Sequence, residues 1–358
     1  MEGVVSMIPN REFKLSELSK VNSSASEIDG SVGKNKKDFS SVQPNTARTT
    51  MNGYTSTGSL NLVAKLDSST DISCGFNKGG ANNLITIQAH NVKANADIVP
   101  SLLASGSFTA IFRATTDTVC APYQVKAVNN GDSGTAKFTG GWHGQEGGLV
   151  GTPTATQISY TYTVDGIDRT SENNISRAGI YKIEFEVVNN IMGYNTFTDS
   201  RYILQEKVKY TIIEGIIQID VEITALEDLI IETYYGLQTQ APDASWNSSI
   251  LFKNSEYSRR SFSADLDSGN KYSGVSSLTS QKGTYELETW VDNTYGLGQR
   301  NQVSDLKPSV FSVYSTKKTY QSLVFGIPLT LLAGEKAYWR GGWCVYVTRN
   351  AVSCHMAE

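Results

Sequence analysis

The stretch GGWHGQEGG, residues 140–148, holds the densest group of residues that could do chemistry. Its glycines let the backbone approach a ligand closely, because glycine carries no Cβ. Trp142 offers a flat face for the C–H groups of a sugar. His143 and Glu146 lie three positions apart, and a histidine with a carboxylate can perform general acid–base catalysis. The alternative is a glycine-rich hairpin loop in which Trp142 packs on the rim of the fold.

A second group follows a strongly apolar stretch. Glu232, Tyr234 and Tyr235 stand close together near the end of an alternating segment. Alternation along a strand places Glu232 and Tyr234 on one face and Tyr235 on the other. A buried glutamate needs a partner, so Glu232 is expected either to bind a polar ligand or to pair with an arginine in a structural network.

A third group is the run Tyr338-Trp-Arg-Gly-Gly-Trp343. Its two indoles, Trp339 and Trp343, can stack on a ligand, and Arg340 can form paired hydrogen bonds with a sugar or a carboxylate. The alternative is a β-hairpin or bulge at the rim of the barrel, with both tryptophans in the core. We predict ligand contacts for Trp142, Tyr234, Tyr235, Trp339, Arg340 and Trp343, and catalytic roles for His143, Glu146 and Glu232 if the protein is an enzyme.

Other chemistry is poorly supported by residue spacing. The letters Gly131-Asp132-Ser133-Gly134 match a serine-protease motif, but His90 precedes Ser133 by too few residues for the two barrels of that fold. His90 itself is expected to be a structural strand residue. The four cysteines show no Cys-x-x-Cys spacing and are expected to be free thiols, so we predict neither a metal site nor a cofactor.

The elements that must position these groups are strands. Segments of alternating apolar residues recur from residue 58 to residue 347, separated by turns rich in Gly, Asn, Asp and Ser. The clearest run, residues 207–238, predicts three antiparallel strands joined by tight turns. We therefore predict an all-β fold, a large β-sandwich, over residues 56–350. Residues 1–55 are expected to be a polar N-terminal extension or connector, and residues 351–358 a C-terminal tail.

Composition limits the function classes. The chain has 358 residues, 39% of them hydrophobic, and a formal net charge of −4. No basic stripe is present to neutralise phosphates, so a nucleic-acid partner is not expected. The sequence contains no run of roughly 20 apolar residues, so a transmembrane helix is not expected. No signal peptide is recognised. The polar leader and the Ser/Thr/Asn/Gly-rich strands are also typical of phage tail or spike components, a setting that would make the chain a virion component.

The order of segments between about residues 135 and 347 resembles the galactose mutarotase-like β-supersandwich superfamily. The resemblance is carried by the 140–148 loop in the place of a His-Gly-Gly-like segment, by KVKYTIIEGIIQIDVEITALED at 207–228, and by the turn at 332–338. It implies a supersandwich fold and a sugar site. The chain departs from the family pattern at Glu232, which stands where the catalytic histidine would lie, and no C-terminal catalytic glutamate is matched.

Two functions follow as expectations. The first is a carbohydrate-recognising β-sandwich protein that belongs to a larger assembly, such as a phage tail, with other copies of itself or structural proteins as neighbours. The second is a carbohydrate-active enzyme, a polysaccharide lyase, epimerase or hydrolase, that uses His143 with an acidic residue or a tyrosine. Both place Trp142, His143, Glu232 and Tyr234 around one concave face.

Overall fold

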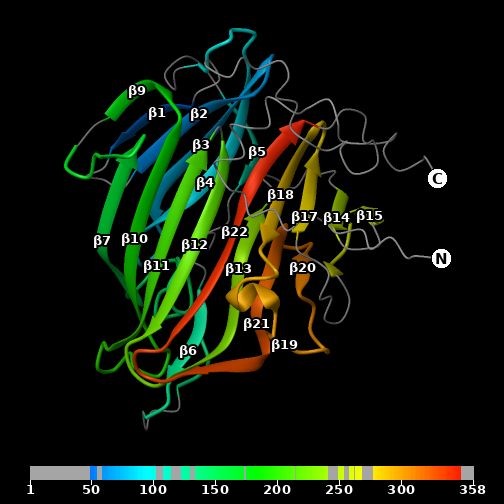
Figure 1. Ribbon diagram of the computed structural model, residues 1–358. Coiled ribbons are helices and arrows are strands. Elements are labelled where there is room, and N and C mark those ends of the chain that lie inside the picture. The colour runs from blue at the N-terminus through cyan, green and yellow to red at the C-terminus, as the bar shows by residue number, and fades with distance from the viewer. Residues whose placement is uncertain are drawn as a thin grey trace, which may run out of the picture.

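The computed structural model describes residues 49–54, 59–101, 108–113, 122–129, 134–172, 175–213, 215–240, 249–253, 258–261, 263–267 and 277–347. These residues form two large β-sheets and one short 3-10 helix, η1 (Gly296–Gln299) (Figure 1). The predicted all-β class is confirmed. Within the described ranges, no helix has the length and apolar character needed to span a membrane.

The larger sheet has 12 strands in the described part of the chain. Its order is β16, β20, β21, β13, β5, β4, β3, β2, β1 and β9, with β6 paired to β13 and β19 paired to β21. The bounds are β1 (Thr49–Tyr54), β2 (Ser59–Asp67), β3 (Thr70–Gly79), β4 (Leu84–Ala94), β5 (Thr109–Arg113), β6 (Tyr123–Ala127), β9 (Ile175–Ile180), β13 (Leu229–Gln240), β16 (Leu266–Asp267), β19 (Gln302–Val303), β20 (Val310–Val313) and β21 (Lys318–Leu331).

The second sheet has 10 strands in the same described part. Its order is β15, β14, β17, β18, β22, β12, β11, β10, β7 and β8. The bounds are β7 (Ala155–Val164), β8 (Ile167–Asp168), β10 (Lys182–Met192), β11 (Tyr202–Ile213), β12 (Ile216–Ala225), β14 (Ser249–Lys253), β15 (Ser258–Ser261), β17 (Ser277–Lys282), β18 (Tyr285–Val291) and β22 (Lys336–Val347).

The predicted three-strand run is distributed over both sheets. β11 and β12 form the expected hairpin, turning at Gly215, whose φ of 78° suits a residue without a Cβ. β13 does not continue the meander. The free edge of β12 is taken by β22, from Ile217 opposite Trp343 to Thr224 opposite Lys336, so β13 crosses into the 12-stranded sheet.

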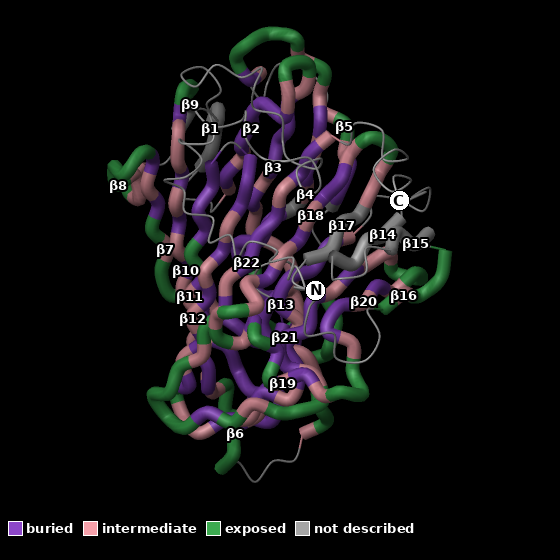
Figure 2. The backbone as a smooth tube through the Cα atoms, turned by 45° about the vertical axis from the view of Figure 1, so that its right-hand side comes forward, coloured by how far each residue is buried: buried purple, intermediate pink, exposed green. Residues whose placement is uncertain are grey.

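The core lies between the two sheets and follows from the alternation of the strands. In β10 every second residue is buried, and β12 alternates in the same way after its first residue. Each of these strands therefore has one buried face. Phe76 from β3 packs edge-on against Phe185 and Tyr210, with centroids 5.1 and 5.4 Å away. Figure 2 shows buried backbone along the strands and exposed turns at their ends.

The N-terminal boundary of the sheet lies earlier than residue 56. β1 falls inside the segment expected to be a polar extension, and it pairs with both β2 and β9. Cys74 and Cys344 are free thiols, as expected, while Cys120 and Cys354 lie outside the described residues. The expected tail at 351–358 also lies outside them.

Candidate functional site

An irregularity in β13 decides which residues can form a site. The register with β6 and with β21 shifts between Ile231 and Thr233, so Glu232 is an extra residue in the strand. Simple alternation therefore fails, and Glu232 and Tyr234 do not share a face as predicted. Tyr234 is fully buried and bonds to the opposite sheet, whereas Glu232 and Tyr235 lie on the outer side of their own sheet.

Glu232 is the centre of a polar group on that outer face. Its Oε1 lies 2.6 Å from the ammonium of Lys126 on β6, and Tyr194 donates its hydroxyl hydrogen bond to Oε2 at 2.9 Å. The side chains of Lys126 and Glu232 are 35% and 28% exposed, so a ligand can reach them. The hydrogen bond to Glu232 raises the pKa of Lys126, and burial together with Glu232 raises the pKa of Tyr194.

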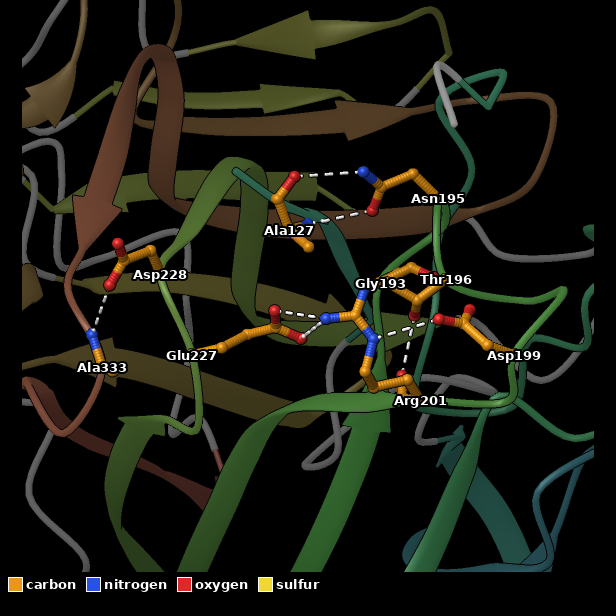
Figure 3. A network of polar contacts seen from close by, with 9 residues as sticks. All are labelled: Ala127, Gly193, Asn195, Thr196, Asp199, Arg201, Glu227, Asp228 and Ala333. Atoms are coloured by element: carbon orange, nitrogen blue, oxygen red, sulfur yellow. Dashed lines mark hydrogen bonds and ion pairs between the residues drawn. The ribbon is translucent and has the colours of Figure 1, made fainter. Parts of the chain in front are cut away.

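A two-point clamp holds the partners of Glu232 in place. Asn195, next to Tyr194, accepts a hydrogen bond from the Ala127 N–H at 2.9 Å and donates one to the Ala127 carbonyl at 3.0 Å (Figure 3). Ala127 follows Lys126 on β6, so the clamp fixes the spacing between Lys126 and Tyr194. In the same turn, Thr196 donates to the carbonyls of Gly193 and Arg201 at 3.0 and 2.7 Å.

Ion pairs support the turn from the side of β13. The Arg201 guanidinium contacts both carboxylate oxygens of Glu227, and its Nε lies 3.2 Å from Asp199 (Figure 3). Asp228, the last residue before β13, accepts a hydrogen bond from the Ala333 N–H at 2.9 Å. Both Glu227 contacts come from one guanidinium nitrogen, Nη1, and they are charge-assisted hydrogen bonds. The start of β13 and the Tyr194 turn are thus held together.

Half-buried aromatic rings gather around Tyr235 on the same outer face. Its ring centroid lies 5.4 Å from those of Phe311, Tyr320 and Phe325, each in an edge-on arrangement, and 5.9 Å from that of Phe138. Phe311 and Tyr320 stack at 4.7 Å. We call these five residues the aromatic surface. Burial raises the pKa of Tyr235 to about 12, so its hydroxyl is neutral and can donate a hydrogen bond.

The segment before the glycine-rich loop joins the polar group to the aromatic surface. A Cβ on Gly134 would lie 3.0 Å from the Tyr194 carbonyl oxygen, which shows how closely this segment passes the Tyr194 turn. Four residues later, Phe138 contacts Tyr235. The segment therefore runs along the outer face of the sheet from Tyr194 to Tyr235.

The glycine-rich loop is anchored by Asn82, a buried residue in the turn between β3 and β4. Its amide nitrogen donates to the carbonyls of Gly141 and His143 at 2.9 and 3.1 Å, and its oxygen accepts from the N–H groups of Thr154 and Ala155 at 2.6 and 2.9 Å. One amide side chain thus bridges both ends of the loop. No motif in the sequence pointed to Asn82.

Trp142 packs against the β3–β4 turn rather than on the aromatic surface. A Cβ on Gly79 or Gly80 would lie 2.5 or 2.3 Å from Trp142 atoms, so both glycines are needed for this contact. The indole therefore has the packing role that was the alternative to ligand stacking. Trp142, Glu232 and Tyr234 do not surround one face, and that expectation is corrected.

The two titratable residues of the loop have different surroundings. The His143 ring lies 5.8 Å from Phe138 at the border of the aromatic surface, and its Nδ1 is 3.3 Å from the Gly147 carbonyl oxygen. Glu146 braces the loop, because its carboxylate accepts from the Thr152 N–H at 3.0 Å and from the Thr152 hydroxyl at 2.9 Å. Hydrogen bonds from its own backbone and from Thr152 lower the pKa of Glu146.

Three predicted ligand contacts are core residues. Tyr234 stacks on Tyr123 with centroids 4.2 Å apart and accepts a hydrogen bond from the Trp339 indole at 3.0 Å. Trp339 and Trp343 are 0% and 1% exposed. All three side chains fill the space between the sheets, because alternation turns this face of β13 and β22 inward. The structure gives them packing in place of ligand stacking.

Arg340 lies on the outer face of the other sheet. Its guanidinium sits 4.0 Å over the Tyr295 ring, and Nε is 3.4 Å from Asp292. This group is separate from the aromatic surface. Among the described residues, no three or more His, Cys, Asp or Glu side chains are arranged to hold a metal ion. Asp132 and Ser133 of the protease-like letters lie outside the described residues.

His90 is a core residue of β4, opposite Cys74 on β3. It is 2% exposed, and neither ring nitrogen has a hydrogen-bond partner. Burial lowers the pKa of His90 to about 4. The histidine is structural, as expected, but its polar atoms are not satisfied.

The sequence matches no protein-family model and no curated protein. Solved structures similar to the chain include the galactosidase domain of an α-galactosidase–sucrose kinase, with 10% identity, a TM-score of 0.43, and coverage of 83% of this chain and 42% of that one. The galactose 1-epimerase from Lactobacillus acidophilus has 8% identity and a TM-score of 0.36, with coverage of 81% and 95%. A galactose mutarotase-like protein from Clostridium acetobutylicum has 8% identity and a TM-score of 0.38, with coverage of 84% and 99%.

Galactose mutarotase-like proteins are thus among the solved structures similar to this chain, as the sequence pattern predicted. The chain spans less than half the length of the α-galactosidase chains it matches.

Proposed function

We propose that the protein binds carbohydrate on the outer face of the 12-stranded sheet, through the aromatic surface and the adjacent Lys126–Glu232–Tyr194 group. The observation that carries the proposal is the position of Tyr235. It contacts four other aromatic rings, and it stands three residues from Glu232 on the same face of β13.

The two halves of this face match the two chemistries of a sugar. Ligand sites are typically lined by aromatic and apolar side chains with a few placed polar groups. Rings such as Tyr235 and Tyr320 can receive the apolar C–H side of a pyranose. Three residues along a strand span roughly 10 Å, so a sugar on Tyr235, or the next unit of an oligosaccharide, can reach Glu232. There, the carboxylate accepts hydroxyl hydrogen bonds and the Lys126 ammonium donates them.

A second candidate is turnover of the bound sugar. It is favoured by one observation, the His143 ring at 5.8 Å from Phe138, which places a histidine at the border of the aromatic surface. The imidazole of a histidine can transfer protons. In this candidate, a carbohydrate-active enzyme uses His143 together with Glu232 or Tyr194.

Binding to a panel of bacterial surface glycans tests the proposal. Tyr235→Ala should weaken binding of the glycans that the wild type retains by at least about tenfold, because it removes the central ring. Tyr338→Ala is the matched control, since Tyr338 is an exposed tyrosine on the other sheet, and it should bind like the wild type. Retained binding in a folded Tyr235→Ala variant, or equal losses in both variants, would contradict the proposal.

The same assay separates binder from enzyme. Product analysis by mass spectrometry detects an epimerised, hydrolysed or unsaturated sugar. Release of product by the wild type and its loss in His143→Ala, with binding retained, would identify the enzyme. General acid–base removal costs on the order of 10²–10⁴ in rate, so the loss is readily measured.

The proposal also includes membership of a larger assembly, such as a phage tail. It is supported by composition alone, since residues 1–48 are rich in Ser, Asn and Lys. Quantitative mass spectrometry of particles purified from the source should find the chain at fixed stoichiometry with other particle proteins. Recovery of the chain solely as free protein would contradict this part.

A further inference from the structure

Lys307 places an ammonium group at the border of the aromatic surface. It lies in the turn that follows β19, and its Nζ stands 4.9 Å from the ring centroid of Phe325. The Phe325 centroid is in turn 5.4 Å from that of Tyr235. An ammonium over the face of an aromatic ring is attracted by the ring electrons, so this placement is favourable. The central ring of the aromatic surface therefore has a cation one ring away.

The turn that carries Lys307 is fixed to β21 through the backbone. The Ser304 N–H donates to the Phe325 carbonyl at 2.9 Å, and the Lys307 N–H donates to the Ser304 carbonyl at 3.0 Å. Gly326 has a φ of 87°, and a Cβ there would lie 3.0 Å from Cγ of Lys307. Glycine thus lets the aliphatic part of the lysine lie close to the β21 backbone. The fold itself directs this side chain toward Phe325.

The charge of Lys307 is not compensated by a carboxylate. In the part of the chain that the structure describes, Lys307 is exposed and forms no ion pair. Lys126, by contrast, is paired with Glu232 at 2.6 Å, so these two charges offset each other. The surface therefore presents one uncompensated ammonium, and it stands over Phe325.

We propose that the sugar on the aromatic surface is a uronic acid and that the Lys307 ammonium binds its carboxylate. This inference rests on the proposed function, since it names the class of sugar for the same surface. Lys307 would then decide specificity, because a neutral hexose has no group that gains from the positive charge.

The geometry suits a carboxylate at the edge of a stacked sugar. The carboxylate of a uronic acid projects outward from the pyranose ring. The ammonium of Lys307 stands over Phe325, so the sugar ring is directed to Tyr235, and its carboxylate comes over the neighbouring ring. There the ammonium supplies up to three hydrogen-bond donors and a full positive charge.

The acidic residues near the aromatic surface leave this position open. Glu232 keeps Lys126 and the Tyr194 hydroxyl as partners, which reduces its repulsion of a second carboxylate. Asp267 is exposed and its residue pairs with Phe311 on β20, away from the turn that carries Lys307. The carboxylate of the sugar is consequently expected beside Lys307.

Calorimetric titration with paired glycans tests the inference. The probes are the uronic-acid-containing members of a panel of bacterial surface glycans, each compared with its carboxyl-reduced form. Reduction converts the carboxylate to a primary alcohol and keeps the rings and linkages. The wild type should bind at least one acidic form at least about threefold more tightly than its reduced form in 50 mM NaCl. Raising the salt to 500 mM should diminish the difference, because exposed charges are screened.

Variants of Lys307 assign the preference to this residue. Lys307→Gln should bind the acidic and reduced forms equally, at the affinity that the wild type has for the reduced form. Lys307→Arg keeps the charge and should keep the preference. Lys209→Gln is the matched control, since it removes one positive charge from the outer face of the other sheet, and it should retain the preference of the wild type.

The outcomes distinguish this inference from the proposal on which it rests. Equal binding of both forms by the wild type, or a preference that survives in Lys307→Gln, would overturn the uronic acid assignment alone, provided that Tyr235→Ala still weakens binding. Absence of binding to every glycan of the panel, acidic and reduced, would contradict both the assignment and the aromatic surface as a sugar site.

Discussion

Two glutamates in this protein show how environment assigns roles to the same side chain. Glu206 is fully buried between the sheets, where Tyr123 donates to it at 2.6 Å and Asn189 at 3.3 Å. Burial and the nearby Glu206 charge raise the pKa of Tyr123 well above its usual value. Glu232 instead sits at the surface beside Lys126. Only the second is placed to exchange its hydrogen bonds for those of a ligand.

His90 gives a prediction about acid stability. Its folded-state pKa of about 4 lies below the ordinary value of 6.5, so between those pH values the unfolded chain binds a proton that the folded chain does not. The titration of His90 therefore leaves the unfolding free energy unchanged above pH 6.5 and lowers it as the pH drops toward 4. The shift corresponds to about 3 kcal/mol of unfolding free energy.

His90→Leu isolates this contribution, because it removes the titrating group and places an apolar side chain of similar size beside Cys74. Urea unfolding at pH 7 and pH 4.5 should show a smaller loss of stability for the variant than for the wild type. The thiol does not confuse the comparison, since burial raises the pKa of Cys74 to about 12 and it stays protonated at both pH values. Equal losses in both proteins would show that His90 is not the acid-sensitive group.

At the scale of elements, the strands were readable from sequence and the irregularities were not. Period-2 alternation predicted the segments that became β2, β4, β7, β10 and β21, and it is clearest in β10, where every second residue is buried. The bulge at Glu232 depends on pairing with β6 and β21, which are far away in sequence. The faces of Glu232 and Tyr234 could therefore not be assigned by counting residues.

For the same reason, only part of the candidate site could be predicted from the sequence. Tyr235, His143 and Glu232 were singled out by residue type. Phe138 and Tyr194 belong to segments with no regular pattern, and their importance appears only when folding brings them to β13. The paired tryptophans of β22 were misjudged because a buried and an exposed indole look alike in sequence.

The Asn82 anchor gives the element-scale prediction. Asn82→Ala removes hydrogen bonds to both ends of the 141–155 segment and leaves buried backbone groups unpaired. We expect a loss of about 2–4 kcal/mol in unfolding free energy and faster trypsin cleavage at Lys137. Gln145→Ala, in the same loop, is the control and should change neither quantity appreciably. Unchanged cleavage in Asn82→Ala would show that the loop is held by other contacts.

At the scale of the whole molecule, the two outer faces are differently equipped. The 12-stranded sheet carries the aromatic surface, whereas the outer face near β22 carries ion pairs such as Lys336–Glu222 at 2.7 Å. Exposed ion pairs are well solvated and contribute little to stability, and no described cluster of aromatic rings lies beside this one. A ligand that needs both stacking and hydrogen bonding is therefore expected on the first face.

The place where the folded body begins gives the last prediction. β1 pairs with β2 along five residue pairs and bonds on its other side to β9, so β9 reaches the sheet only through β1 in the described part of the chain. Residues 1–48 are rich in polar side chains, which bury little apolar surface. Deleting residues 1–48 should therefore change Tm by less than about 2 °C.

Deleting residues 1–54 removes β1 as well and is the matched comparison. It exposes the edge of β2 and frees β9, so we expect Tm to fall by about 5–10 °C in differential scanning calorimetry. The six additional residues would then account for nearly all of the loss, because they are the ones that the sheet incorporates. A large drop in Tm on deleting residues 1–48 alone would instead show that these residues pack on the sandwich.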